Sequence, residues 1–192
     1  NGQGNYGDDV AIAAIDELND MFFSHNVVFQ IDTIARTEND DWFGDWYDQS
    51  WQATQELSID PFNNMNVYTA NLFASGVAGF SYLASQFPAG DGRHSVNVDY
   101  RDLSPGQDVL THEVGHHLGL PHTFSGSCNL DGDGIDDTPK HLDSQLWNCN
   151  ENLDSCPNDE GNDPVHNYMT YTSGSCRYEF TTGQEDYMHY CI

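Results

Sequence analysis

In the first third of the chain, the spacing of hydrophobic residues is first that of a helix and then that of a β-strand. From residue 8 to residue 25, apolar side chains recur every three or four positions, which predicts an amphipathic helix. The first two residues of that stretch are aspartates, placed to cap the helix and to favour its dipole. Residues 27–34 alternate apolar and polar side chains, which predicts a β-strand. The stretch 39–46 is typical of a loop, and 49–57 of a weaker helix.

The middle of the chain predicts short strands and one strong helix. Residues 65–70 and 94–98 are strand candidates, and the glycine- and aromatic-containing stretch 74–85 between them adds a possible third. Residues 107–118 predict a helix that ends at Gly119.

Hydrophobic periodicity fades after about residue 120. Residues 121–178 are rich in Gly, Asp, Asn, Ser and Cys and are expected to be irregular. A short final helix is expected over 182–190, with Thr181 or Thr182 as its cap. The loss of periodicity therefore marks the start of a second, loop-rich part of the chain.

Length and composition favour one folded domain. The chain has 192 residues, of which 38% are hydrophobic and 12% aromatic, enough to build a core. We expect residues 1–192 to form a single domain, with an upper lobe at about 1–121 and a lower lobe at about 122–192.

The charge is strongly one-sided. Thirty-one acidic residues face five basic ones, for a formal net charge of −26. Such a chain repels phosphate backbones and anionic lipids, so neither nucleic-acid binding nor membrane docking is expected. The longest apolar run, residues 10–15, is far shorter than a bilayer span. Mutual repulsion also favours a monomer.

All the cysteines lie in the last third of the chain. This clustering predicts disulfides that hold together a loop-rich region, and therefore an oxidising compartment. Reduced cytosolic thiols are the alternative. The odd count leaves one thiol over, for which Cys191 is the candidate; the five positions are Cys128, Cys149, Cys156, Cys176 and Cys191.

The richest chemistry lies in the stretch from His112 to His122, His-Glu-Val-Gly-His-His-Leu-Gly-Leu-Pro-His. On a helix, residues four apart share a face, so His112 and His116 can bind one metal ion. Gly119 permits a sharp turn that returns the chain with His122 as a third ligand. Three protein ligands leave one tetrahedral position for water, which is typical of a catalytic zinc site. His117 lies off the ligand face and is expected to pack or to face solvent.

The eleven-residue motif resembles the zinc signature of the metzincin metallopeptidases. The stretch 167–171, Asn-Tyr-Met-Thr-Tyr, resembles the methionine turn of that clan. Within the clan, the chain is most similar to the pappalysin family, of the ulilysin type. The stretches that carry this likeness are residues 36–42, 122–124, 136–139, 164–169 and 179–184.

The resemblance implies a fold and an activity. The implied fold is α+β, with an N-terminal α/β lobe built on a twisted, mostly parallel sheet and the active-site helix. An irregular, disulfide-stapled C-terminal lobe would complete a metzincin-type zincin, with a cleft between the lobes. The implied protein is a secreted zinc endopeptidase that hydrolyses peptide bonds of proteins or peptides.

The resemblance also implies roles for individual residues. His112, His116 and His122 would bind Zn²⁺, and Glu113 would act as general base and then general acid. Met169 would form the base of the site. Tyr171 would stand near the metal, where its hydroxyl could stabilise an oxyanion. The implied disulfides are Cys128–Cys156 and Cys149–Cys176.

A glycine-rich acidic loop follows the motif. Carboxylates gathered in one loop repel each other unless a cation neutralises them, and oxygen ligands suit Ca²⁺. The resemblance likewise implies structural calcium here, whereas an exposed acidic turn is the alternative. The calcium candidates are Asp131, Asp133, Asp136, Asp137 and Thr138.

Two further points bear on function. Arginine-preferring pappalysins carry an Asp two residues before the cysteine that follows the methionine turn, and Gly174 occupies that position here. A strict preference for basic residues is therefore not expected. The alternatives to a peptidase are a catalytically silent metal-binding recognition module and a calcium-stabilised structural domain. The intact Glu113 disfavours the first of these, and the open fourth metal position disfavours the second.

Overall fold

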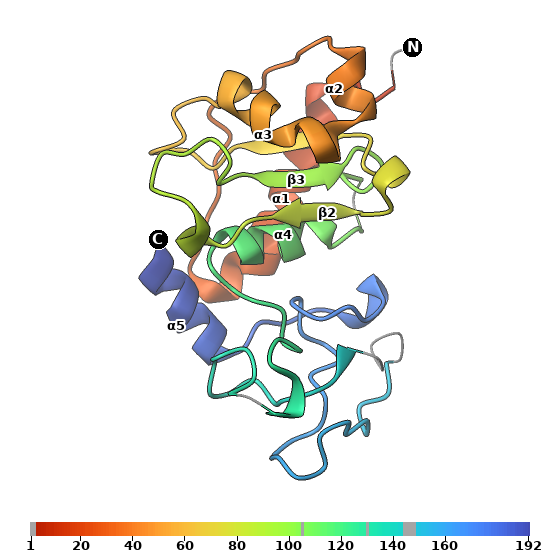
Figure 1. Ribbon diagram of the computed structural model, residues 1–192, viewed down its shortest axis with the longest axis vertical. Coiled ribbons are helices and arrows are strands. Elements are labelled where there is room, and N and C mark those ends of the chain that lie inside the picture. Colours follow the sequence, from red (N-terminus) through yellow and green to blue (C-terminus); the bar gives the residue numbers. More distant parts are fainter. Residues whose placement is uncertain (1–2, 105, 130, 144–148) are drawn as a thin grey trace. The chain divides into compact units, whose positions relative to one another are not determined.

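The computed structural model describes residues 3–104, 106–129, 131–143 and 149–192. It divides into two compact units, Asn1–His117 and Leu118–Ile192, referred to below as unit 1 and unit 2. Figure 1 labels the helices α1 to α5 and the strands β2 and β3. None of the helices in the described part of the chain has the length and apolar composition that a membrane span needs.

The first helix of unit 1 confirms the helical period at the start of the chain. It comprises α1, Asp8–Phe22, followed by one 3-10 turn, η1, Phe23–His25. Its apolar positions three to four residues apart, including Leu18 and Phe22, are buried. The two aspartates do not cap it, because Gly7 is the N-cap residue; they lie in the first turn, where they favour the dipole.

A three-stranded sheet forms the centre of unit 1. The strands are β1, Val67–Ala70, β2, Gly79–Ser81, and β3, Val96–Asp99, in the order β1-β3-β2. β1 pairs with β3 in parallel, whereas β2 pairs with β3 in antiparallel fashion. The described sheet is therefore mixed rather than mostly parallel. All three strands fall inside the expected strand regions, except that β3 extends one residue further.

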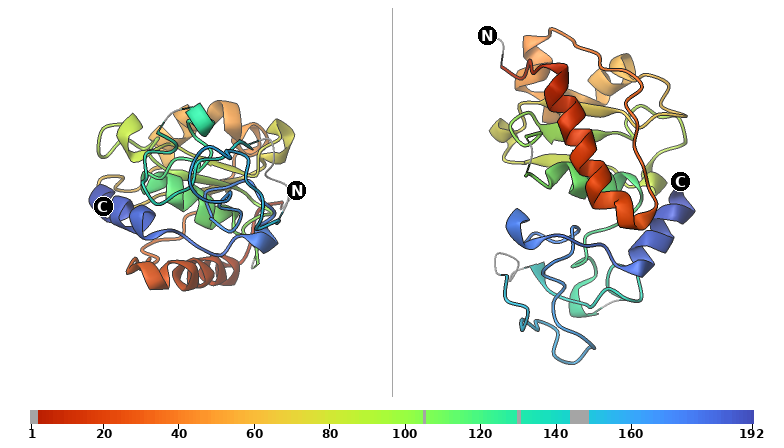
Figure 2. Two further views of the ribbon diagram at one scale, coloured as in Figure 1. Left: turned by 90° about the horizontal axis from the view of Figure 1, so that it is seen from below. Right: turned by 180° about the vertical axis from the view of Figure 1, so that it is seen from behind.

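Helices cover both faces of this sheet (Figures 1 and 2). On one face, Trp46 of α3, Trp46–Leu57, donates its indole N–H to Asn97 Oδ1 at 2.8 Å. Successive side chains of a strand point to opposite faces, so the fully buried Val96 and Val98 point to the other face. There the sheet meets α4, Val109–His117, which in turn packs against α1.

One expected loop is a helix. Residues 39–46 contain a short helix, α2, Asp40–Gly44, which is followed at once by α3. The Asn39 side chain caps α2 by accepting a hydrogen bond from the Trp42 N–H at 3.0 Å. The loop expectation was wrong because the local signal is this cap and not hydrophobic periodicity.

The strand expected over residues 27–34 is not present among the described elements. The segment has no assigned secondary structure, and Val28 and Ile31 are exposed. A cavity of 530 Å³ is lined both by this segment and by β1. Alternation predicts which residues can lie extended, but a strand also needs a hydrogen-bonded neighbour. Here the Phe29 backbone instead bonds to the Asn19 side chain of α1, at 2.7 and 2.9 Å.

Unit 2 is mostly irregular, as its composition predicts. Its described elements are two 3-10 turns, η4, Ser127–Asn129, and η6, Gly174–Cys176, and the final helix α5, Thr182–Cys191. Thr181 caps α5 through a reciprocal capping box with Gln184. This helix confirms the expected C-terminal element, including one of its two candidate caps.

Two disulfides cross-link the irregular part of unit 2. Cys128 is bonded to Cys156 and Cys149 to Cys176, which are the pairs that the resemblance implies. Cys191 is the free cysteine. With little regular secondary structure, unit 2 depends on these bonds to restrict its unfolded chain.

Candidate metal centre

The helix that carries the first two histidines of the motif is almost wholly enclosed. Residues 110–116 of α4 are buried, and the helix packs against β2 and β3. His112 and His116 lie one turn apart on it, with ring centroids 4.7 Å apart and ring planes at 88°. The four-residue spacing therefore brings both imidazoles to one face, as expected.

A glycine turn follows the helix and leads to the third histidine. Gly119 has a φ of +98°, a conformation that disfavours residues with a side chain. A Cβ there would also lie 2.7 Å from the Cys191 sulfur. The expectation of a strained turn at Gly119 is therefore confirmed.

The three histidines converge. His112, His116 and His122 each offer a ring nitrogen, and these nitrogens lie within 4.8 Å of one another. Three neutral imidazole nitrogens at this spacing form a donor set that suits Zn²⁺ and other borderline divalent metals. The residues present therefore fit a metal ion held by three protein ligands.

Glu113 lies against the edge strand of the sheet. Its side chain is only 5% exposed. A Cβ added to Gly79 of β2 would lie 2.8 Å from Glu113 Cγ and 2.9 Å from its Oε1. Gly79 therefore leaves the space that the carboxylate occupies beside β2. This role of Gly79 was not predicted from the sequence, although a glycine within a strand pattern is a known sign of close backbone approach.

Aromatic rings hold His122 within unit 2. Phe124 stacks on its imidazole at 4.7 Å with an interplanar angle of 11°, and Tyr171 packs edge-on at 4.6 Å. Tyr171 is 45% exposed, so a substrate could reach its hydroxyl. The structure thus places Tyr171 beside one of the proposed metal ligands.

Met169 is fully buried in a turn that is fixed from two sides. Asn167 and Gln184 exchange side-chain amide hydrogen bonds at 2.7 and 3.1 Å, which joins the turn to α5. The Thr123 N–H, next to His122, donates to the Met169 carbonyl at 3.2 Å. These contacts restrain the methionine turn close to the third histidine.

The carboxylates of the acidic loop do not converge on one point. Among the described His, Cys, Asp and Glu side chains, the three histidines are the one group of three or more close enough to share a metal. Asp137 accepts hydrogen bonds from the Thr181 hydroxyl at 2.7 Å and from the Gly183 N–H at 2.8 Å. Its carboxylate therefore anchors the start of α5.

Two atoms of the same loop are buried without a hydrogen bond of good geometry, Asp133 Oδ2 and Thr138 Oγ1. Burial raises the pKa of Asp133 to about 6, because it penalises the charged carboxylate more than the neutral acid. A buried oxygen of this kind is a site where a cation or water is favoured.

His117 packs against another histidine. Its ring stacks on that of His94, with centroids 4.0 Å apart and planes at 15°. Burial, reinforced by His94, lowers the pKa of His117 to about 3, so its imidazole is neutral near pH 7. Of the two roles expected for His117, packing and exposure to solvent, the structure shows packing. The partner could not be foreseen, because 23 residues separate the two histidines.

The fold is that of a known peptidase class. Mature mirolysin of Tannerella forsythia, solved in complex with a cleaved peptide, superposes with a TM-score of 0.77. The match covers 96% of this chain and 84% of that one, at 23% sequence identity. A likeness at this identity shows the fold, which is the α+β fold of a metzincin metallopeptidase.

The sequence relatives carry the same class name. A protein of Pyricularia oryzae named an extracellular metalloprotease is 34% identical over 179 residues, covering 87% of this chain and 61% of the relative. A Verticillium alfalfae protein of the same name is 33% identical, covering 90% and 63%. The chain thus spans less than two thirds of the length of these relatives.

The family itself is shown by its sequence model. The peptidase M43 model, described as pregnancy-associated plasma protein-A, matches residues 48–192. The chain therefore belongs to this pappalysin family, and the resemblance drawn from the zinc motif and the methionine turn is confirmed.

Proposed function

We propose that this chain is the catalytic domain of an extracellular, zinc-dependent endopeptidase that cleaves peptide bonds of proteins or peptides. The observation that carries this proposal is the convergence of three imidazole nitrogens within 4.8 Å, with the buried Glu113 next to the first of them in sequence. Membership of the M43 family and the names of its extracellular relatives support it. Two disulfides fit an oxidising compartment.

The residues present supply the steps of peptide hydrolysis. His112, His116 and His122 would hold zinc, which would supply a lowered water pKa, toward about 7, and polarisation of the substrate carbonyl. Glu113 takes the proton of the attacking water and then delivers it to the leaving amine, so one carboxylate serves both steps. The Tyr171 hydroxyl donates a hydrogen bond to the developing oxyanion.

The edge of the sheet offers a place for the substrate backbone. β2 is an edge strand of the described sheet, so one side of its backbone is free to pair with an extended peptide. Gly79 places that strand directly beside Glu113. A peptide paired along β2 would therefore pass the general base. Gly174 provides no carboxylate, so no strict preference for arginine is expected.

We further propose that residues 1–192 act as one metallopeptidase domain and a monomer, with structural calcium in the loop from Asp131 to Thr138. The support for calcium is the pair of buried oxygens without good hydrogen bonds, Asp133 Oδ2 and Thr138 Oγ1. Cation binding would draw further carboxylates of the loop toward them.

The substitution Glu113→Gln tests the main proposal. The amide keeps the shape of the side chain but cannot accept the proton, so hydrolysis of a casein substrate should fall by at least about a thousandfold. Zinc content, measured by elemental analysis, should remain at one ion per chain.

Glu56→Gln is the matched control, since Glu56 is an exposed residue of α3 that accepts from Gln52. It should leave both activity and zinc content unchanged. Wild-type protein that holds zinc but cleaves no member of a mixed peptide pool would favour the silent recognition module instead. Near-normal turnover by Glu113→Gln would remove Glu113 from the mechanism.

A further inference from the structure

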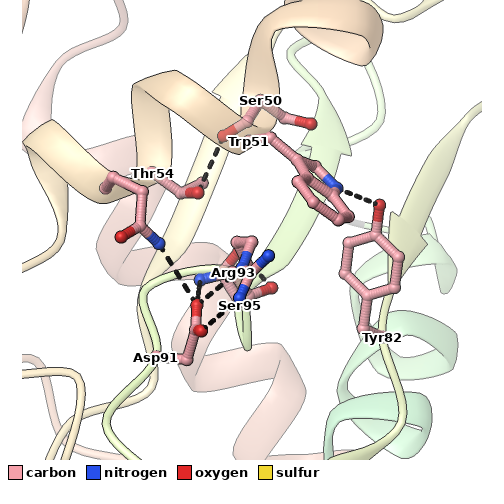
Figure 3. Close-up of polar contacts among 8 residues, drawn as sticks. Ser50, Trp51, Thr54, Tyr82, Asp91, Arg93 and Ser95 are labelled. Atoms are coloured by element: carbon pink, nitrogen blue, oxygen red, sulfur yellow. Dashed lines mark hydrogen bonds and ion pairs between the residues drawn. The ribbon is translucent and has the colours of Figure 1, made fainter. Parts of the chain in front are cut away.

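The loop that precedes β3 is fixed to helix α3. Arg93 forms two hydrogen bonds with Asp91, from Nε to Oδ1 at 2.9 Å and from Nη2 to Oδ2 at 2.6 Å. Gln55 of α3 donates a further hydrogen bond to Asp91 Oδ1 at 3.2 Å. Figure 3 labels Asp91 and Arg93 and draws the contacts between them. The backbone around residues 91–93 is therefore restrained from the side of α3.

Aromatic rings enclose the same arginine. The Arg93 guanidinium lies 4.5 Å from the ring of Trp51 and 4.3 Å from that of Phe87, within the range of cation–π attraction. The Trp51 indole N–H in turn donates to the Tyr82 hydroxyl at 3.0 Å (Figure 3). Arg93 is thus held by its ion pair with Asp91 and by contacts with two aromatic rings.

The next residue, His94, contacts the end of the metal-binding helix in two ways. Its ring stacks on that of His117 at 4.0 Å, and its Nε2 lies 3.1 Å from the His117 carbonyl oxygen. Because a carbonyl oxygen only accepts, Nε2 carries the proton and donates it. His117 is the last residue of α4.

The hydrogen bond from His94 meets a need of that helix end. The last carbonyl groups of a helix lack partners within the helix, and a buried one without a partner is unfavourable. His94 supplies the partner for the last residue of α4. The stacked ring adds a packing contact to the last residue of the helix.

We propose that His94 is a positioning residue for the metal centre: it fixes the C-terminal end of α4 and thereby the orientation of the His116 imidazole. The loop that contains Asp91 and Arg93 is restrained by α3, and it therefore fixes the backbone position of His94. The effect on metal binding rests on the proposed metal site. Groups that orient ligands without touching the metal typically change metal affinity by about 10- to 100-fold when removed.

Three substitutions separate the two contacts. His94→Ala removes both, His94→Phe keeps the stacked ring but loses the donor, and His94→Gln keeps a donor near the Nε2 position but loses the ring. We expect the zinc dissociation constant, measured by competition with a chromophoric chelator, to rise at least about tenfold in His94→Ala and His94→Phe. His94→Gln should recover part of the affinity.

Two further measurements distinguish positioning from a purely structural role. The visible absorption bands of the Co²⁺-substituted protein should shift in His94→Phe, because they report ligand geometry. The Tm of the metal-free protein reports folding alone. His189→Phe, on the surface of α5, is the matched control and should change neither the zinc Kd nor the spectrum.

Zinc affinity within twofold of wild type in both His94→Ala and His94→Phe would overturn the proposal, as would a lower metal-free Tm with an unchanged Kd and cobalt spectrum. These readouts do not require peptidase activity. Wild-type protein that binds zinc tightly but cleaves no peptide would count against the proposed function alone and leave the role of His94 testable.

Discussion

The hydroxyl of Tyr171 is the one group of unit 2 to which we assign a chemical step. Its ring packs on His122 at 4.6 Å, and nearly half of its surface is exposed. Tyr171→Phe keeps the ring contact and removes only the donor, so kcat should fall on the order of 100-fold. KM should change little, because the hydrogen bond strengthens in the transition state. Steady-state kinetics on a fluorogenic peptide measures both.

Tyr190→Phe provides the control, since Tyr190 is 87% exposed on α5. It should reproduce wild-type kinetics. An unchanged kcat in Tyr171→Phe would leave Tyr171 with only its packing role around His122.

The buried Asp133 makes the stability of the calcium-free protein depend on pH. Its pKa is raised to about 6 by burial, above an unfolded value near 4, so the folded state binds the proton more tightly. Its contribution to stability is therefore present below about pH 4 and is lost as the pH rises through about 6. After allowance for solvent screening, that loss is about 1–2 kcal/mol.

Asp133→Asn isolates this contribution. In metal-free protein, the Tm of the variant relative to wild type should increase as the pH is raised from 4 to 7. Calcium should raise the Tm of wild type at pH 7 and affect the variant much less. A Tm difference that does not change with pH would contradict the raised pKa of Asp133. If calcium also left the Tm of wild type unchanged, the proposed calcium site would be excluded.

Single residues differ in how far the sequence reveals them. The three histidines are predictable because helical spacing and one glycine determine where they point. The contact of Gly79 with Glu113 and that of His94 with His117 depend on the packing of β2 and β3 against α4, which no local pattern encodes. Residues that support a site from other elements are thus the ones that sequence reasoning misses.

At the scale of elements, the close approach of β2 to α4 restrains the proposed base, Glu113. An added Cβ at Gly79 would lie 2.8 Å from Glu113 Cγ and 2.9 Å from the Asn97 carbonyl oxygen. The carbonyl belongs to the sheet and cannot yield, so in Gly79→Ala the Glu113 side chain must move. We expect kcat to fall at least about tenfold and the free energy of unfolding by about 1–3 kcal/mol.

Zinc content should be retained in Gly79→Ala, because no metal ligand is displaced. Gly44→Ala is the control, since a Cβ there meets nothing within 4 Å. Wild-type kcat in Gly79→Ala would mean that the strand can shift and does not fix the base.

Elements with their own periodicity or caps are the predictable ones. The helices α1, α4 and α5 all follow from local pattern. The segment 27–34 has a strand pattern but pairs with no strand in the described part of the chain. Helix α2 has a cap but hardly any hydrophobic periodicity. Strand pairing is a long-range property. The strand order β1-β3-β2, with its mixed parallel and antiparallel pairing, therefore could not be predicted from local sequence patterns either.

At the scale of the whole molecule, one quantity dominates, the net charge of −26. Like charges of this number repel one another more strongly in the compact state than in the expanded unfolded chain. The repulsion is screened over about 30 Å at 10 mM salt but over about 8 Å at 150 mM. Raising the salt concentration should therefore stabilise the folded chain.

We expect the Tm of metal-free protein to rise by several degrees between about 10 and 150 mM NaCl, measured by differential scanning calorimetry at pH 7. Tetramethylammonium chloride at equal ionic strength should give the same rise, because screening depends on charge and not on ion identity. A rise with sodium alone would indicate a bound cation instead. A flat or falling Tm in both salts would show that the acidic residues are spaced widely enough to tolerate one another.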